Sequence, residues 1–296
     1  MEKNAQSFDC DAQYSVSDLA IESANQNAIS QYAKRTSLDF GIIRYDLNVK
    51  TVEQSRELSK PCGVYITFDA PKSVQYDDNV SGALIRYLST ALKNTVGIVK
   101  KSAPVLVVGL GNKNITADAL GQIVVDNVRI TSGTDAPYNQ QRVCALSTGV
   151  LGTTGMQTVD ILCGVADKIK PCLVIAADSL ATSSVSRVGC SFQLSTAGIT
   201  PGSGVGQDRE RIDKSILGVP VISIGVPLML TMRTALYSFV KGYMNDVGQS
   251  VDEFRLRQNL ADSNLLKLVV APKEIDYLAN KCAYIIADAI NKTFEN

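Results

Sequence analysis

Three short apolar runs that contain no charged residue constrain the fold most: residues 104–110, 172–177 and 219–225. A strand with helices packed on both faces has this composition, because neither face of the strand meets water. Two further runs, 63–69 and 266–270, have the length of strands. These runs alternate with longer segments of helical period, and the alternation predicts a wound α/β fold with a largely parallel sheet flanked by helices.

The segment between the runs 63–69 and 104–110 shows the helical period most clearly. Apolar residues recur there at every fourth position, at Val80, Leu84, Leu88 and Leu92, which places them on one face of a helix. The expected helices are 78–95, 157–169, 228–246 and 273–293, with a shorter one opening at 17–24 and capped by Ser17 or Asp18.

The chain is expected to form one folded body behind a short tail. The sequence has no internal repeat, and its most glycine-rich stretch, 198–206, is too short to link two domains. Residues 1–17 show no periodicity. The amino terminus is polar and no apolar run reaches the length of a membrane span, so we expect a cytoplasmic protein.

Charge limits the kinds of partner that this chain can bind, and cysteine content limits its disulfides and metal sites. The 29 basic residues balance the 29 acidic ones, so we expect neither direct nucleic acid binding nor attraction to an anionic membrane. The seven cysteines are an odd number and form no C-x-x-C pair, which argues against disulfides and against a zinc site. Small polar molecules or proteins are better partners for this chain.

The sequence contains no histidine. Serine and cysteine hydrolases normally use an imidazole as base, and the common catalytic zinc sites use imidazole ligands. Acid–base chemistry at neutral pH must then come from Asp and Glu, or from Lys, Tyr and Cys. We expect no metal and no cofactor.

The first candidate site follows the run 104–110. Gly109, Gly111 and Asn112 lie where a strand gives way to a helix, and Asp118 lies in the first turn of that helix. The strand-to-helix edge is where α/β proteins bind ligands. The simpler interpretation is a tight glycine turn with Asp118 capping the helix dipole.

Two more candidates follow later strands. Asp178 ends the run 172–177, where an acid needs a role or a partner, although it could instead cap a helix at 179–186. A loop containing Gly202, Ser203 and Gly204 could cradle an anion or lie along a peptide, or it could be a structural turn.

Several stretches together resemble the germination protease family of spore-forming bacteria. They are DLAIES at 18–23, GVYIT at 63–67, LVVGLGN and TADALG within 106–121, STGVLGTTGMQT at 147–158, KPCLVIAADSLA at 170–181, TPGSGVG at 200–206 and LGVPVISIGVP at 217–227. Each stretch is weak alone, but their order and spacing agree from residue 18 to residue 227.

The resemblance implies an atypical aspartic endopeptidase that degrades small acid-soluble spore proteins during germination, in the forespore or spore core. It implies a zymogen with a short propeptide, a homotetramer, and the phosphorylase-like fold of the related hydrogenase maturation peptidases. The two aspartates essential to the family match Asp118 and Asp178. Thr196, Thr200 and Thr231 replace residues usual in the family, so altered substrate binding remains an alternative.

Our working hypothesis is that Asp118 and Asp178 share one water, with one carboxylate as base and the other as acid. Amides of 109–112 or 202–206 would stabilise the oxyanion. A catalytically altered family member, or an α/β protein that binds a small ligand through its glycine loops, are the alternatives.

The family's substrates are cut after an acidic residue and before an apolar one, a description that fits Asp18-Leu19. We therefore expect a propeptide at 1–18, in an exposed tail, and a single peptidase domain at 19–296. The tail could equally lie across the active site until it is cut.

Overall fold

The structure is a computed structural model that describes residues 17–22, 26–97, 103–133, 140–202, 210–260 and 268–295. Its strands are β1 (Ala33–Ser37), β2 (Ile43–Val49), β3 (Gly63–Asp69), β4 (Val105–Gly109), β5 (Val143–Ser147), β6 (Leu173–Ala181), β7 (Ser191–Ser195), β8 (Val221–Thr231) and β9 (Val269–Val270). Its longer helices are α3 (Asp78–Val96), α4 (Leu120–Asn127), α6 (Thr158–Ile169), α8 (Met232–Asp246) and α11 (Ile275–Phe294). Shorter helices are α1 (Gln26–Tyr32), α2 (Val52–Leu58), α5 (Leu151–Thr154), α7 (Lys214–Leu217) and α9 (Glu253–Asn259).

The strands form one nine-stranded sheet in the order β1-β2-β3-β7-β8-β6-β4-β5, and β9 pairs with β8. The neighbours β8, β6, β4 and β5 are parallel. The charge-free runs predicted the first three of these strands, whereas β5 was not predicted. The strands β1, β2, β3 and β7 continue the sheet in antiparallel pairing, which was not predicted. The fold is therefore α/β, with a parallel half and an antiparallel half.

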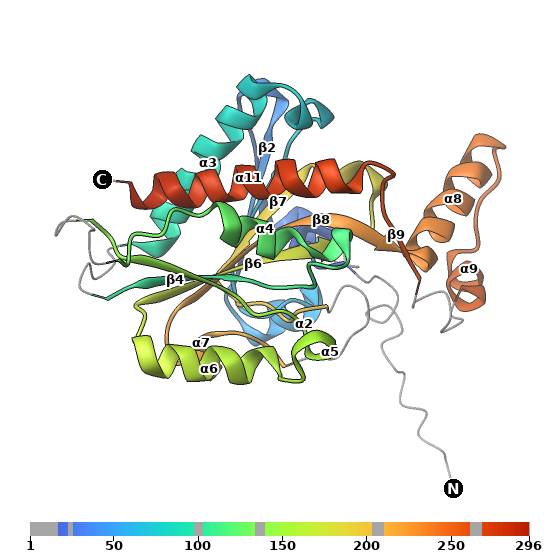
Figure 1. Ribbon diagram of the computed structural model, residues 1–296. Helices are drawn as coiled ribbons and strands as arrows, with labels where there is room; N and C mark the ends of the chain where they lie inside the picture. Colours follow the sequence, from blue (N-terminus) through green and yellow to red (C-terminus); the bar gives the residue numbers. More distant parts are fainter. Residues whose placement is uncertain are drawn as a thin grey trace, which may run out of the picture.

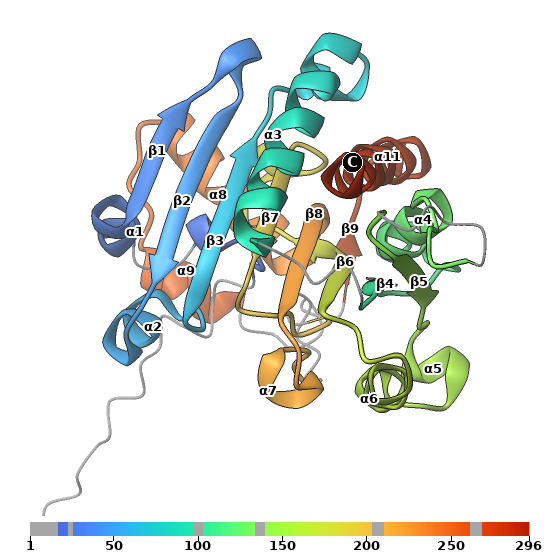
Figure 2. The same ribbon diagram turned by 90° about the vertical axis from the view of Figure 1, so that its left-hand side faces the viewer.

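Helices cover both faces of the parallel half. Figure 2 shows α3, α4 and α11 on one side of the sheet and α6 and α7 on the other. Side chains alternate accordingly: Val107 and Ile175 pack towards α3, α4 and α11, whereas Val108 and Val174 pack towards α6 and α7. This alternation fixes which strand residues can reach the second face, where the functional site lies.

Most predicted elements are confirmed with small changes at their ends. Helix α3 follows 78–95 closely, but the helix expected at 228–246 begins only at Met232. Residues 228–231 extend β8 instead, and this strand is buried along its whole length. The helix expected at 17–24 is one 3-10 turn, η1 (Ala20–Glu22), in the described part of that range.

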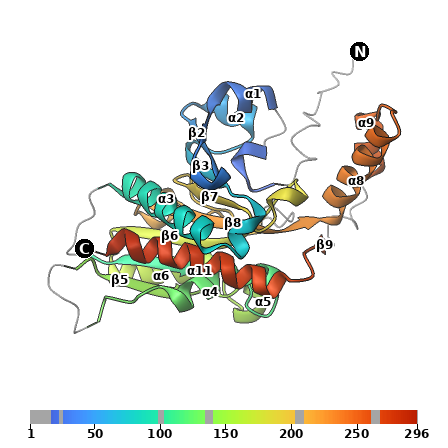
Figure 3. The same cartoon turned by 90° about the horizontal axis from the view of Figure 1, so that it is seen from above.

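Helices α8 and α9 project from the layered body (Figures 1 and 3). The outer face of α8 and the residue after it expose Phe239, Tyr243 and Val247, which are spaced at every fourth position. None of the helices described is long and apolar enough to cross a membrane.

Candidate active site

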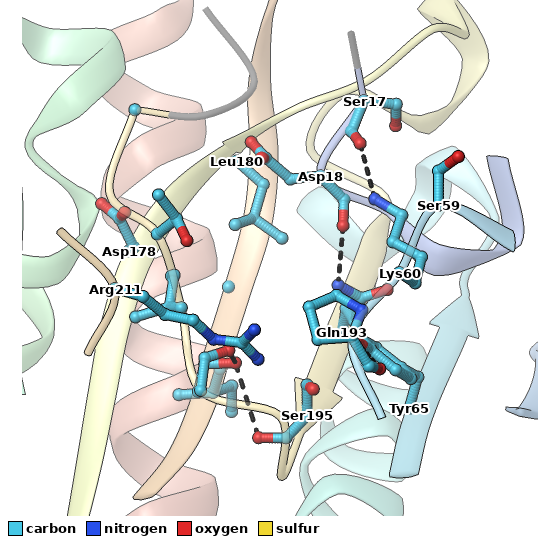
Figure 4. Close-up of a pocket in the computed structure, with 18 residues that line it drawn as sticks. Ser17, Asp18, Ser59, Lys60, Tyr65, Asp178, Leu180, Gln193, Ser195 and Arg211 are labelled. Carbon is cyan, nitrogen blue, oxygen red and sulfur yellow. Dashed lines mark hydrogen bonds between the residues drawn. The ribbon is translucent and has the colours of Figure 1, made fainter. Parts of the chain in front are cut away.

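A pocket of about 350 Å³ opens on the sheet face that carries α6 and α7. Its floor is made by four neighbouring strands, β3, β7, β8 and β6. Asp178 of β6, Gln193 of β7 and Gly225 of β8 all line it, together with Ser17, Asp18 and Lys60 (Figure 4). We refer to this cavity as the Asp178 pocket.

Asp178 lies within β6 and is only 4% exposed. One carboxylate oxygen accepts a hydrogen bond from the Ser179 amide at 2.9 Å. The alternative that Asp178 caps a helix at 179–186 is wrong, because residues 179–181 continue the strand. A carboxylate on a buried strand that faces a cavity is costly to retain without a function or a partner.

Asp118 ends a 3-10 turn, η4 (Thr116–Asp118), between β4 and α4. Its carboxylate accepts a hydrogen bond from the Asn112 amide at 2.8 Å. The alternative that Asp118 caps the following helix is also wrong, because the cap position of α4 is Ala119 and carries no side-chain cap bond. Asp118 instead closes the loop after β4, where Gly111 has a φ of 95° and an added Cβ would collide with the Asp118 carbonyl oxygen.

The two aspartates belong to neighbouring parts of the parallel half: Asp178 lies within β6, and Asp118 lies on the η4 turn that follows β4. Gly109 pairs with Ala177, the residue before Asp178, and the Leu110 amide donates to the Ala177 carbonyl at 2.9 Å. The η4 turn packs on the same edge through a cluster formed by Ala117, Ala181 and Met229. Asp118 is not, however, among the described residues that line the Asp178 pocket.

The segment Ser17–Glu22 occupies one side of the pocket. The Asp18 amide donates to the Ala181 carbonyl at 3.0 Å, and the Ala181 amide donates to the Asp18 carboxylate at 2.8 Å. Lys60 Nζ donates to the Ser17 carbonyl at 2.8 Å (Figure 4). Leu19 is fully buried, so the expectation of an exposed Asp18-Leu19 bond is wrong.

Glu22 anchors this segment. Its carboxylate accepts hydrogen bonds from Ser17 Oγ and the Ser183 amide, both at 2.6 Å, and from Arg187 Nη1 at 2.8 Å. Burial acts to raise the pKa of Glu22. The hydrogen bonds from Ser17 and the Ser183 amide, together with the guanidinium of Arg187, outweigh burial and lower it.

Two further side chains shape the electrostatics of the pocket. Withdrawal from solvent lowers the pKa of Lys60, while the carboxylates of Asp18 and Glu22 partly offset this effect. Burial raises the pKa of Tyr65 to about 12, and its hydroxyl donates to the Pro61 carbonyl at 2.7 Å. Tyr65 therefore remains protonated at neutral pH.

Only part of the candidate loop at 200–206 can be placed in the structure. Gly202 and Thr200 line the Asp178 pocket, whereas Ser203 and Gly204 lie outside the described residues. Of the amides expected to stabilise an oxyanion, Leu110 and Asn112 already donate to groups of the chain, the Ala177 carbonyl and Asp118.

The other two unusual threonines have structural contacts. Thr196 Oγ1 accepts the Val64 amide at 2.9 Å, and Thr231 Oγ1 caps α8 by accepting the Thr234 amide at 3.2 Å. Neither is among the described residues that line the pocket.

Sequence reasoning missed Gln193, Lys60 and Glu22. Gln193 and Lys60 carry no recognisable motif, and their role appears only when β7, the loop before β3 and η1 meet at one pocket. Glu22 lies within DLAIES, a stretch that supported the family resemblance, and the signal available was an acid directly after the apolar residues 19–21. Among the residues that the structure describes, no cluster of His, Cys, Asp or Glu has the arrangement of a metal site.

The pocket thus holds one buried carboxylate on a strand of the parallel half of an α/β sheet, and proteins of this fold class bind their ligands beside such strands. The germination protease family model matches residues 16–266. The chain belongs to the germination protease family.

Relatives match along most of their length. The germination protease of Caldanaerobacter subterraneus subsp. tengcongensis is 34% identical over 93% of this chain and 92% of that protein. That of Clostridium perfringens strain 13 is 31% identical over 93% of each. That of Oceanobacillus iheyensis is 37% identical over 73% of this chain and 64% of that protein.

Among solved structures, the [NiFe] hydrogenase maturation protease HycI from Thermococcus kodakarensis KOD1 gives a TM-score of 0.38 at 17% identity. It covers 68% of this chain and 98% of that one. A likeness of this size carries no information about the site.

Proposed function

We propose that this chain is an aspartic-type endopeptidase, made as a zymogen, that initiates degradation of small acid-soluble spore proteins during germination. It acts in the cytoplasm of the forespore and in the spore core. Membership of the germination protease family supports the activity and its setting. One structural observation carries the proposal further: a peptide segment of the chain itself, Ser17-Asp18, forms one side of the pocket that Asp178 lines, and Gln193 of that pocket binds the Asp18 carbonyl.

In the proposed reaction, Asp178 and Asp118 activate a water and return a proton to the leaving amine. Asp178 is assigned to the water because it lines the same pocket as the peptide segment Ser17-Asp18. Asp118 is assigned because the turn that carries it packs on the edge shared by β4 and β6, where Ala117 lies in one apolar cluster with Ala181. No cofactor or metal enters this scheme, because the chain has no histidine and carboxylates suffice for both proton transfers.

The segment 1–18 is the proposed propeptide and 19–296 the peptidase domain. The buried contacts of Asp18 and Leu19 agree with the alternative in which this segment lies across the active site until it is cut. Once cut, residues 17 and 18 would vacate one side of the pocket and leave room for a substrate.

We also propose that the protein assembles as a homotetramer. The exposed stripe formed by Phe239, Tyr243 and Val247 supports self-association, because two of these side chains are aromatic and the stripe lies on a helix that projects from the body. Deleting this stripe with Phe239→Ser and Tyr243→Ser would give a smaller assembly in analytical ultracentrifugation.

The endopeptidase function is tested with the processed protein and a purified small acid-soluble spore protein. We expect discrete cleavage products by mass spectrometry, at bonds between an acidic and an apolar residue. The matched control is Asp178→Asn, which keeps the volume of the side chain and removes its charge, and should give no products. Saturable binding of nucleotides without any cleavage would favour the ligand-binding alternative instead.

A further inference from the structure

The side chain of Gln193 forms hydrogen bonds on both sides of the Asp18-Leu19 peptide bond. Its Nε2 donates to the Asp18 carbonyl oxygen at 3.1 Å, as Figure 4 shows. Its Oε1 accepts the Ala20 amide at 2.7 Å. Only one orientation of the amide satisfies both contacts, because the reverse would set nitrogen against N–H and oxygen against C=O.

The amide is held in place by the sheet. Gln193 is 7% exposed and lies in β7, paired with Thr67 on one side and Gly225 on the other. The Thr67 hydroxyl also donates a hydrogen bond to Gln193 Oε1, at 3.4 Å. A buried donor on a central strand does not need to reorganise when charge develops on its acceptor.

Asp178 faces this donor across a glycine. Asp178 and Gln193 both pair with Gly225, from β6 and β7 respectively, so the three residues form one row on the pocket floor. Two strand spacings separate the outer residues by about 10 Å at their Cα atoms. A Cβ added at Gly225 would lie 2.8 Å from Leu180 Cγ, so the Leu180 side chain fills the space over the glycine. A peptide carbonyl and a water would enter beside it, in the pocket that Asp178, Leu180 and Gln193 all line.

We propose that Gln193 is a catalytic residue of this protease, and that its Nε2–H stabilises the oxyanion formed on the carbonyl before the cleaved bond. The inference deepens the proposed endopeptidase function and rests on it. The Asp18 carbonyl is the example within the chain itself, and an incoming substrate would place its own carbonyl there.

The reaction balances as a hydrolysis. The oxygen of water bonds to the Asp18 carbonyl carbon, and the C=O electron pair moves to the oxygen that faces Gln193 Nε2. A carboxylate takes one proton from the water. When the oxyanion collapses, the C–N bond to Leu19 breaks, and the leaving nitrogen receives that proton. The products are a carboxyl group on Asp18 and an amino group on Leu19.

The test follows self-cleavage of the full chain by intact-protein mass spectrometry, which yields one rate constant for each variant. Gln193→Met keeps the length of the side chain but removes the donor, and we expect the rate constant to fall about 100-fold or more. The matched control is Gln141→Met. Gln141 is also buried and donates to a backbone carbonyl, that of Ala103 at 2.9 Å, but it is not among the described residues of the pocket. This control should cleave at close to the wild-type rate.

A second variant separates a chemical role from a structural one. Gln193→Glu presents an acceptor to the carbonyl when ionised and an O–H donor when protonated. Its rate relative to wild type should therefore rise as the pH falls, whereas that of Gln193→Met should stay low. Circular dichroism would establish that the variants are folded.

Wild-type rates for Gln193→Met, equal losses in Gln193→Met and Gln141→Met, or cleavage of the wild-type chain at another bond would each overturn the role of Gln193. The failure of the underlying function looks different. In that case the wild-type chain cleaves neither itself nor a small acid-soluble spore protein.

Discussion

Asp178 and Gln193 face the same pocket from the two strands that flank β8, and Gly225 is the residue between them. An acid able to activate water and a donor able to hold a carbonyl thus line one pocket, with the Leu180 side chain over the glycine between them. The chain's own residues Ser17 and Asp18 form one side of this pocket, where Gln193 contacts the Asp18 carbonyl. The arrangement links the proposed catalysis to the proposed processing.

The glycine between them is a first point of test. A Cβ added at Gly225 would lie 2.6 Å from the Asp178 carbonyl oxygen and 2.8 Å from Leu180 Cγ. We expect Gly225→Ala to lower the free energy of unfolding by about 1–3 kcal/mol and to lower activity more than stability explains. Gly164→Ala is the control, because Gly164 lies in α6 with no atom in the way, and it should stabilise the protein slightly. Urea unfolding and cleavage assays on both variants would measure this, and an unchanged Gly225→Ala would contradict it.

Asp118 has a structural contact as well as a proposed catalytic role, and two substitutions separate them. Asp118→Asn keeps an oxygen that accepts the Asn112 amide, so the fold should be as stable as wild type while proteolysis is lost. Asp118→Ala removes this acceptor and should cost about 1 kcal/mol in addition. Thermal unfolding and cleavage of a spore-protein substrate are the measurements. Near-normal turnover by Asp118→Asn would contradict the catalytic role of Asp118 and leave only its contact with the Asn112 amide.

The hold on segment 17–22 should depend on pH through Glu22. The pKa of Glu22 is lowered in the folded protein. The contribution of Glu22 to stability is therefore fully present above the ordinary carboxyl pKa of about 4.3, and it is lost as the pH falls below that value. Hydrogen exchange should show protection of the amides of Leu19–Glu22 falling through this window. In Glu22→Gln, protection should be low already at neutral pH and should not change across it. Protection in the wild-type protein that persists in acid would contradict the role of Glu22.

Chelators should leave proteolysis unchanged, since the chain has no histidine and no cysteine pair of the C-x-x-C type. The assay compares cleavage before and after dialysis against a strong chelator. Loss of activity that one specific metal restores would contradict the carboxylate mechanism.

The strands β4, β6 and β8 of the parallel half could be predicted because they are buried along their length and contain long charge-free runs. The strands β1 and β2 could not, because AKRTS and IRYDLNV contain several charged or polar residues; β1 is largely exposed at the edge of the sheet, and β2 beside it is mostly half-buried. Their place depends on antiparallel pairing with β3, a contact that local sequence does not encode.

The aspartates could be predicted from their position after strands, but the surroundings of Asp178 could not. Gln193 lies more than a hundred residues along the chain from both Lys60 and Asp18. Only the order of the strands in the sheet brings the three residues to one pocket. Burial of the Asp18-Leu19 bond was missed for the same reason, because the Ala181 backbone that holds it lies on a strand far along the chain.

The most direct test of the central claim is the identity of the new amino terminus when the purified full chain is left to process itself under mild acid. We predict loss of residues 1–18 and a mature chain that begins at Leu19, with no processing in Asp178→Asn. Intact mass and amino-terminal sequencing would measure both. A different terminus, or processing of the purified Asp178→Asn chain on its own, would contradict the account.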